Sequence, residues 1–316
     1  MPVRAPEHST QVRPFRRADR DQLTDLVNRH AAAVLPGVSA SVNTVLGSLE
    51  QRPDEYVTDP WVAERHTLVA VDRARVVAAA HLLRYRGGAD VDRSYRDTGA
   101  IDWFLHLPGD GASAADHLMS ACLHHLSRWH SPTWHADGNL PVPGVCGVPE
   151  PWPHIRARYR DAGFQHDGTT ELLLIADLAD LTDLTAPAGA VRIHRTVGDL
   201  GIRFEARLAG RSVGHLEVDT GLDRAERRPR GAALADVADL HLAAEARPDT
   251  LPALLSEAAD WLRRCGVDRL LAYADGTAVG VSAGVSGSAD DPTALLCRHG
   301  FGELTRTARG WSRSGR

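Results

Sequence analysis

At 316 residues and 34.2 kDa, the chain is about twice the usual length of a domain, so we expect two packed units. Its formal net charge of -5 argues against a general nucleic-acid binder, which needs a concentrated positive field. All 36 basic residues are arginines, which excludes lysine Schiff bases and the phosphate-binding lysine of P-loop proteins.

The amino-terminal residues 1–17 lack the apolar core of a signal peptide, and no apolar run approaches the roughly 18 residues of a membrane span. Four cysteines are widely separated and form no CxxC pair: Cys122, Cys146, Cys265 and Cys297. Such spacing is typical of reduced thiols rather than of a disulfide framework or a zinc site. These features predict a cytoplasmic protein with neither a membrane nor a nucleic-acid partner.

The first half of the chain alternates strand and helix signals. A strand from Val12 leads into an apolar-periodic helix. Two apolar strands, 67–71 and 76–85, flank a polar turn and predict a β-hairpin. A further strand covers 103–107. It precedes a helix that is indicated by apolar residues at helical spacing, namely Ala115, Leu118, Met119, Cys122 and Leu126.

The second half repeats this order. Three short motifs recur at offsets between 135 and 138 residues: Leu105-His106-Leu107 at 240–242, Ala136-Asp137-Gly138 at 274–276, and Gly163-Phe164 at 300–301. A second hairpin is predicted over 203–208 and 212–218, followed by a helix over 251–262. We therefore predict a tandem duplication. Its domains are expected at 1–176 and 190–316, joined by a linker at 177–189 that contains Pro187 and a brief helix over 179–184.

Two segments carry a resemblance to a known family. Val12 to Asp19 resembles the first strand and helix of GNAT-superfamily N-acetyltransferases, and Tyr159 to Phe164 resembles the Tyr-x-x-x-Gly-Phe ending of that fold's last helix. The resemblance implies an α+β protein with two tandem GNAT-like domains, each a mixed, mostly antiparallel twisted sheet flanked by helices. It also implies acetyl-CoA as acyl donor and a small-molecule amine as acceptor.

GNAT proteins hold the pyrophosphate of acetyl-CoA on a glycine-rich turn before the central helix, where backbone N–H groups and the helix dipole attract anions. Residues expected at this turn are Leu107, Gly109, Gly111, Ala112, Ser113 and Ala114. Asp110 adds an unfavourable charge, and Ser113 with Asp116 predicts a capping box. In the second half, Asp249 occupies the place of a glycine and Pro252 lacks an N–H donor, so we expect that turn to be impaired.

The resemblance implies that Tyr159 protonates the departing thiolate, because reference pKa values of about 10 for phenol and about 8.5 for thiol are well matched. Its counterpart in the second half is Leu296, so the first half is expected to carry the chemistry. The alternative is that Tyr159 is an ordinary helix residue. Asp102 and His106, placed on one strand face by alternation, are candidate bases. By this motif match, His241 repeats His106 in the half expected to be inactive, which favours a structural role for His106.

Prolines concentrate between residues 140 and 154, close to the expected acyl-transfer site. Trp152 and His154 of this segment, together with Trp103, are candidate acceptor contacts, although an inter-domain packing loop remains the alternative. Four histidines cluster between residues 124 and 135, but no carboxylate completes a ligand set, so no metal site is predicted. Three other functions stay open: a non-catalytic GNAT-fold protein that sequesters a metabolite or partner, a different acyl thioester, and an active site in the second half.

Overall fold

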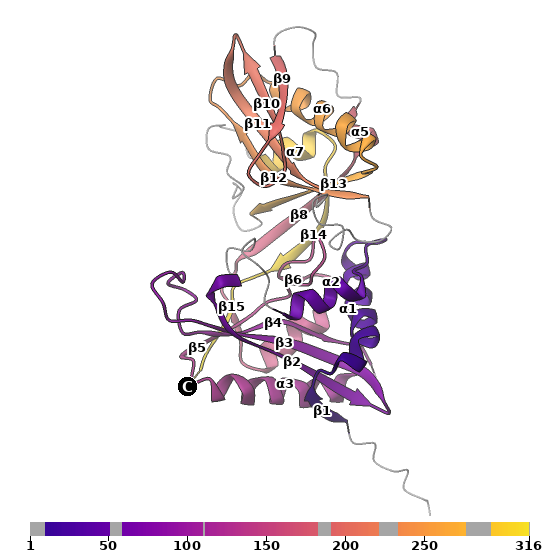
Figure 1. Cartoon of the computed structure of the whole chain (residues 1–316), viewed down its shortest axis with the longest axis vertical. Helices are drawn as coiled ribbons and strands as arrows, with labels where there is room; N and C mark the ends of the chain where they lie inside the picture. The colour runs from indigo at the N-terminus through magenta and orange to yellow at the C-terminus, as the bar shows by residue number, and fades with distance from the viewer. Residues whose placement is uncertain are drawn as a thin grey trace, which may run out of the picture. The chain divides into compact units, whose positions relative to one another are not determined.

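The computed structural model describes residues 10–50, 59–109, 111–182, 191–220, 233–275 and 292–315. It divides into two compact units, one formed by Met1–Thr169 together with Ala308–Arg316 and the other by Thr170–Thr307. Each unit contains a mixed sheet with helices packed on it (Figure 1). The predicted α+β class with two similar units is confirmed.

The sheet of the first unit is mostly antiparallel, and one parallel pair, β4 with β5, lies near its middle. In spatial order its strands are β1 (Gln11–Pro14), β2 (Val62–Asp72), β3 (Arg75–Tyr85), β4 (Gly99–His106), β5 (Thr133–Ala136), β15 (Trp311–Ser314) and β7 (Gln165–His166). The hairpin predicted from apolar strands around residue 74 is therefore present.

Helices cover both faces of this sheet (Figure 1). The segment between β1 and β2 contains η1 (Arg17–Asp19), α1 (Arg20–Val34), α2 (Val42–Leu49) and η2 (Asp59–Trp61). Helix α3 (Ala112–Arg128) lies on the opposite face. After β5, the chain forms β6 (Val148–Pro149) and α4 (Pro153–Asp161). The apolar residues that predicted α3 by their spacing are buried against the sheet, including Leu118, Cys122 and Leu126.

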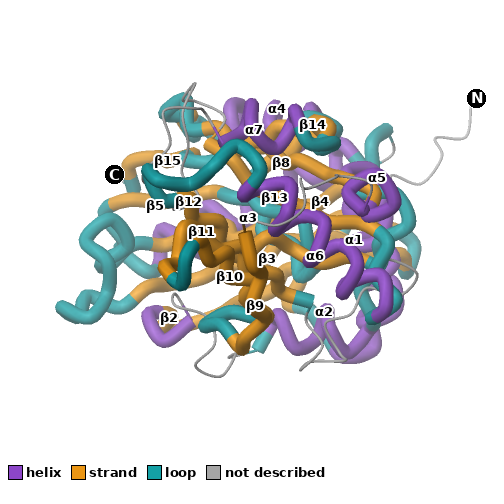
Figure 2. Tube along the Cα trace, turned by 90° about the horizontal axis from the view of Figure 1, so that it is seen from above, coloured by secondary structure: helices purple, strands orange, loops and turns teal. Residues whose placement is uncertain are grey.

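The second unit repeats the pattern with fewer helices. Its strands run in the order β14 (Gly302–Ala308), β8 (Thr170–Asp177), β13 (Arg269–Asp275), β12 (Leu234–Leu242), β11 (Arg211–Asp219), β10 (Ile202–Leu208) and β9 (Val191–Val197), and β12 pairs with β13 in parallel. The helices are α5 (Leu178–Thr182), α6 (Thr250–Arg264) and α7 (Pro292–Arg298), and α5 packs beside α6 (Figure 2). A turn at residues 198–201 joins β9 to β10, where the first unit has α1 and α2.

The two units share their hairpin in detail. Its turn has two residues with positive φ, Arg73 and Ala74 in the first unit and, 136 residues later, Ala209 and Gly210 in the second. A β-bulge follows each turn, and a second bulge interrupts the pairing with the next strand at the same offset. Because bulges and turns fix the register of a ladder, they establish the duplication independently of sequence motifs.

This register corrects one expectation. His106 pairs with Ala78, whereas the residue that occupies the same place in the second unit is Leu242, paired with Gly214. His241 is instead the counterpart of Leu105. The prediction that His241 repeats His106 is therefore wrong by one residue, because the Leu-His-Leu motifs match as letters but not as ladder positions. His241 is therefore no evidence that His106 has a structural role.

The units also divide the chain differently from the predicted boundaries of 1–176 and 190–316. Strand β8 follows β7 in sequence yet lies in the second sheet, between β13 and β14, while β15 lies in the first sheet between β5 and β7. The last strand of each half has thus been exchanged, since a strand belongs to the sheet that pairs its backbone groups. The brief helix expected at 179–184 corresponds to α5, and Pro187 lies outside the described residues.

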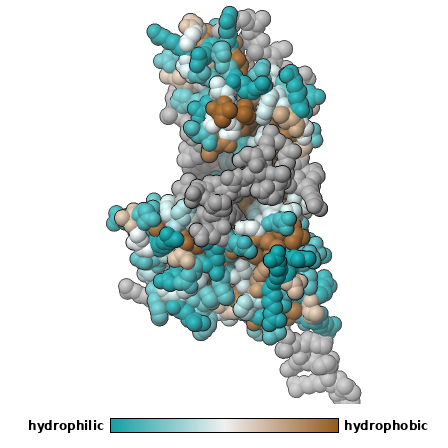
Figure 3. Space-filling model, viewed as in Figure 1, coloured by the Kyte–Doolittle hydropathy of each residue, from teal (hydrophilic) through white to brown (hydrophobic). Residues whose placement is uncertain are grey.

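The helices, cysteines and surface of the described residues show few unusual features. In the part of the chain that the structure describes, no helix combines the length and apolar character needed to cross a membrane. The four cysteines, all within the described residues, form no disulfide bond. Hydrophilic residues predominate on the face drawn in Figure 3, and hydrophobic residues form separate patches. Among the described residues, the exposed large hydrophobic side chains are Val197 and Leu200, beside the β9–β10 turn.

Candidate functional site

Strands β4 and β5 of the first unit are paired over a short stretch and then separate. Their ladder runs from Gly99 to Ile101, and two backbone bonds extend it, from Asp137 N–H to Ile101 (2.9 Å) and from Asn139 N–H to Asp102 (3.0 Å). Beyond this point, no described strand pairs with the β5-facing edge of β4. The stretch from Trp103 to His106 therefore has no strand partner on this side among the described residues, and its four residues are at most 2% exposed.

Asp102 lies where the two strands separate. The side-chain amide of Asn139 donates to its carboxylate at 3.1 Å. The second bulge of the hairpin falls at this residue, because His81 pairs with Trp103 and Leu82 pairs with Ile101. The bulge breaks the strict alternation by which Asp102 and His106 were placed on one face.

The turn between β4 and α3 is tightly wound around two glycines. Gly109 has φ +79°, and its carbonyl accepts from the N–H of Ala112 at 2.9 Å. Gly111 is the N-cap of α3, and a Cβ atom on it would lie 2.4 Å from the carbonyl oxygen of Leu107. Nothing lies within 4 Å of a Cβ built on Gly109, so the space above that residue is open.

The predicted capping box of Ser113 and Asp116 is wrong. The helix begins two residues earlier than that box requires, and its N-cap, Gly111, has no side chain to accept from the first-turn N–H groups. Asp116 instead forms an ion pair with Arg158 of α4. Asp110 lies outside the described residues. Among the residues that are described, no side chain caps α3. The Ala112 N–H already donates to the Gly109 carbonyl, so the N–H groups of Ser113 and Ala114 are the ones that can receive an anion.

The corresponding turn of the second unit contains two charged side chains, those of Asp249 and Arg247. Asp249 is the N-cap of α6, and its carboxylate faces the guanidinium of Arg247 at 3.3 Å. The hydroxyl of Thr250 accepts from the Arg247 N–H at 3.0 Å. Pro252, within the first turn, contributes no N–H donor. A carboxylate at this position repels phosphate, so this turn does not fit a pyrophosphate.

Tyr159 of α4 reaches the point where β4 and β5 separate. Its ring is fully buried against Phe104, Phe164 and Trp311. Its hydroxyl donates to the backbone carbonyl of Asp137 at 2.6 Å. Burial raises the pKa of this phenol well above its ordinary value, and nearby carboxylates add to the effect. Its single proton is thus engaged with the main chain.

Asp137 is the other charged group at this place. The guanidinium of Arg309 approaches its carboxylate at 3.5 Å, and the N–H of Gly138 donates to it at 2.8 Å. Burial nevertheless raises the pKa of this carboxyl, against the lowering effect of both partners. Sequence reasoning missed both Asp137 and Arg309, since their meeting depends on the exchanged carboxy-terminal segment.

His106 ends β4 and is 2% exposed. Its Nδ1 lies 3.0 Å from the carbonyl oxygen of Leu107, and its Nε2 is buried with no hydrogen-bond partner among the described residues. A carbonyl can only accept, so Nδ1 carries the proton and Nε2 presents a lone pair. Burial lowers the pKa of the ring and keeps it neutral at pH 7. Nε2 is therefore the ring nitrogen of His106 that has a lone pair to accept a proton.

No protein-family model matches the sequence, and no curated protein matches it by sequence. Solved structures do match. A tandem GNAT protein from the clavulanic acid biosynthesis pathway superposes with a TM-score of 0.63 at 17% identity, over 98% of this chain and 99% of that one. A GCN5-related N-acetyltransferase from Sphaerobacter thermophilus gives 0.60 at 14%, over 97% and 96%. The chain has the tandem GNAT fold.

A third match is a GCN5-related glucosamine N-acetyltransferase region in a fungal multi-domain GH3 beta-N-acetylglucosaminidase. Its TM-score is 0.61 at 17% identity, over 97% of this chain, and the present chain spans 38% of that longer one. The three superpositions, with TM-scores from 0.60 to 0.63, establish a shared fold. The GNAT resemblance noted for Val12 to Asp19 and for Tyr159 to Phe164 is thereby confirmed at the level of architecture.

Within this GNAT fold, the aromatic residues expected to contact an acceptor serve as packing. Trp103 is 1% exposed and stacks on His81 at 5.8 Å between ring centroids. Trp152 is equally buried, and its indole N–H donates to the backbone carbonyl of His30 at 3.1 Å. His154 remains half-buried and touches both His30 and His106.

His30 is a site residue that sequence reasoning missed. It lies on the buried face of α1, among Leu23, Leu26 and Val27, so helical periodicity alone marks it as a core position. Its meeting with His106 and His154 depends on the way α1 and α4 pack near the end of β4. No local pattern in the sequence connects residues so far apart.

The histidines between residues 124 and 135 do not converge. His125 stacks on His66 at 4.1 Å between centroids, and the Nε2 of His135 lies 3.2 Å from the carbonyl of Ser94. Within the described ranges, no group of three or more His, Cys, Asp or Glu residues is placed to hold a metal ion.

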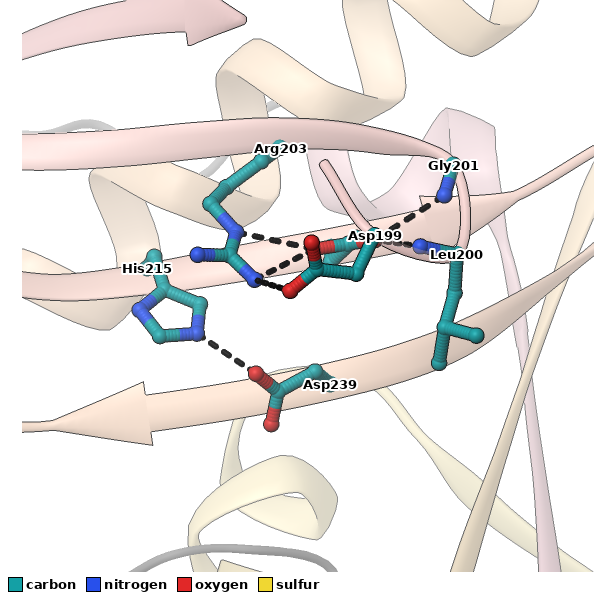
Figure 4. Close-up of polar contacts among 7 residues, drawn as sticks. Asp199, Leu200, Gly201, Arg203, His215 and Asp239 are labelled. Atoms are coloured by element: carbon teal, nitrogen blue, oxygen red, sulfur yellow. Dashed lines mark hydrogen bonds and ion pairs between the residues drawn. The ribbon is translucent and has the colours of Figure 1, made fainter. Parts of the chain in front are cut away.

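The second unit carries a polar network at the β9–β10 turn and on the neighbouring strands β10, β11 and β12 (Figure 4). Glu217 is fully buried and accepts from the N–H groups of Leu200 and Gly201 and from the guanidinium of Arg203. Beside it, His215 and Asp239 form a cross-strand pair at 2.6 Å. Each residue drawn there makes at least one polar contact, and the network holds the β9–β10 turn against β11.

Proposed function

We propose that the amino-terminal unit is an acyl-CoA-dependent N-acetyltransferase that acts on a small-molecule amine. The observation that carries this proposal is the uncapped start of α3, bounded by Gly109 and Gly111, beside the unpaired edge of β4. The corresponding turn of the other unit holds the carboxylate of Asp249. The chemistry therefore belongs to one unit.

Acetyl-CoA supplies a thioester acetyl group to such a site. The backbone N–H groups at the start of α3 would hold its pyrophosphate, at Gly109, Gly111 and the following residues Ala112, Ser113 and Ala114, with Leu107 at the turn entrance. The amine attacks directly, without an acyl-enzyme. His106 Nε2 accepts a proton from the nitrogen, with Asp102 as the second candidate base.

Tyr159 is our candidate for returning a proton to the sulfur. Its place at the separation of β4 and β5 supports this role, and its raised pKa keeps it protonated. To act, the hydroxyl must leave the carbonyl of Asp137. That bond is also the specific observation that favours our second candidate function, a GNAT-fold protein that binds a metabolite without catalysis. Cysteines that form no disulfide bond favour the cytoplasmic location that we propose.

The decisive experiment measures acetyl-CoA binding by calorimetry and thermal stabilisation, together with CoA release over a panel of primary amines. A ligand at 100 times its dissociation constant adds about 2.7 kcal/mol to the free energy of unfolding. We expect binding, turnover of at least one amine, and loss of most turnover in Tyr159→Phe with binding intact. Asp249→Gly is the matched control in the other unit and should leave turnover unchanged.

The two functions separate cleanly in this assay. Binding without CoA release would establish the non-catalytic alternative. No binding at all would refute both, and activity raised by Asp249→Gly but untouched by Tyr159→Phe would move the active site to the second unit.

A further inference from the structure

N-acetylation of an ammonium group leaves one proton to be disposed of. The nitrogen loses two protons as the C–N bond forms and the C–S bond breaks; one goes to the thiolate and the other must reach solvent. His106 is 2% exposed and cannot hand a proton to water directly. A buried base in this position therefore needs an exit, and the following inference rests on the proposed function.

Three imidazoles from three separate elements meet at the end of β4. His154, at the start of α4, lies against the ring of His106 with centroids 4.8 Å apart and planes nearly perpendicular. On its other side, its Nε2 is 3.4 Å from the Nε2 of His30 on α1. Of the three rings, His154 is the most exposed.

The backbone fixes the proton positions of this cluster. The Nδ1 of His30 lies 2.9 Å from the carbonyl of Leu26, which can only accept, so His30 carries its proton on Nδ1. Its Nε2 is then an acceptor, and the bond between the two rings runs from His154 Nε2–H to His30 Nε2. This leaves the Nδ1 of His154 with a lone pair, as on the Nε2 of His106.

The surroundings keep all three rings neutral. Burial lowers the pKa of His30 and of His154 to about 4 and lowers that of His106 as well. Arg158 lowers the pKa of both His106 and His154, while Asp116 raises that of His106. These are the charged groups that act on the cluster from α3 and α4. A proton taken up here is therefore held weakly and passed on readily.

We propose that His154 is the proton exit for His106, and that His30 is a positioning residue that holds the His154 ring. His106 takes the proton from the attacking nitrogen on Nε2. After a small rotation of the ring, His154 accepts that proton on Nδ1 and releases it to solvent. His30 takes no proton in this sequence.

The first test uses CoA release with whichever primary amine of the panel is turned over. His154→Ala is expected to lower kcat about tenfold to a hundredfold with little change in KM, and added imidazole is expected to restore part of the rate. His30→Gln keeps an acceptor for His154 and should cost less than His30→Ala. His124→Ala, an exposed histidine of α3, is the matched control and should leave kcat unchanged.

A second test needs no turnover. Long-range proton–nitrogen NMR spectra report which nitrogen of each histidine is protonated. We expect Nδ1–H for His30 and His106 and Nε2–H for His154 at pH 7. We also expect that His154→Ala shifts the titrations of the other two rings.

The outcomes distinguish this inference from the proposed function. If the wild type releases CoA and His154→Ala releases it equally fast, or is slower but not rescued by imidazole, then His154 is not the proton exit. The proposed acetyltransferase function is unaffected by that result. If no amine is turned over, the proposed function fails. If the NMR spectra then place the proton of His106 on Nε2, or show that the three rings titrate independently, the coupling of the three histidines is also refuted.

Discussion

Glu217 is fully buried in the second unit, and its carboxylate accepts several hydrogen bonds. Two backbone N–H groups of the β9–β10 turn and the guanidinium of Arg203 converge on its carboxylate (Figure 4). The turn can approach so closely because Gly198 has no side chain; a Cβ there would lie 2.2 Å from the same carboxylate. One residue thus holds a turn that replaces two helices of the first unit.

Glu217→Ala should destabilise the protein by about 2–4 kcal/mol, because it leaves buried donors and a guanidinium without their acceptor. Glu205→Ala, on the same face but paired with the more exposed Arg207, should cost less than about 1 kcal/mol. Urea unfolding of both variants measures the difference. Equal losses would show that the carboxylate does not organise the turn.

His30 makes stability depend on pH. Its pKa is about 4 in the folded protein and about 6.5 when unfolded, so between these values the unfolded chain binds more protons. Acidification through this window therefore favours unfolding. We expect His30 to account for on the order of 2 kcal/mol of the stability lost from pH 7 to pH 4.

His30→Phe keeps a buried ring without a titrating group and should show a shallower loss of unfolding free energy over that range. Denaturant unfolding at several pH values is the measurement. Parallel profiles for the variant and the wild type would contradict a depressed pKa at this residue.

At the scale of elements, the start of α3 is the feature on which the proposed function depends. A Cβ on Gly111 would lie 2.4 Å from a backbone oxygen, so Gly111→Ala must displace the turn and should abolish stabilisation by acetyl-CoA. Gly210→Ala is the control: its φ of +82° costs about 1 kcal/mol, but it lies in open space at the second hairpin. Thermal shifts with and without acetyl-CoA compare them, and an undiminished shift for Gly111→Ala would refute the turn as the binding element.

Helices and hairpins were predictable because their signals are local. Apolar spacing identified α3 and α6, and paired apolar strands identified both hairpins. The bulges were not predictable, since a single extra residue in a ladder leaves no mark in the sequence. His241 was matched to His106 because the letters repeat at an offset of 135 residues, whereas the ladder positions repeat at 136. Tyr159 was located correctly on its helix, but its bond to Asp137 depends on the approach of α4 to β5.

At the scale of the whole molecule, the exchanged strands escaped prediction altogether. The two sheets have equivalent positions for β8 and β15, so the residue pattern of each strand does not determine which sheet it joins. The consequence for the first unit is direct, because β15 brings Trp311 against Tyr159 and Arg313 to the carbonyl of Ala162. The end of the chain thus completes the unit that contains the candidate site.

Removing residues 308–316 should therefore unfold or loosen the first unit, although most of that unit's sequence is untouched. Hydrogen exchange should report lost protection in β5 and β7, and a peptide of residues 308–316 added in trans should restore it. Trp311→Ala, a milder change, should cost about 3–5 kcal/mol. Removal of Arg316 alone is the control. Native exchange rates in the truncated protein would show that β15 is dispensable.

The reciprocal position of β8 and β15 also bears on ancestry. Each terminates its own half and inserts at the matching place in the other sheet, between β13 and β14 or between β5 and β7. This is the connectivity that a homodimer with swapped carboxy-terminal strands acquires when two gene copies fuse into one reading frame. Because each half supplies a strand to the sheet of the other, neither half contains all the strands of its own sheet.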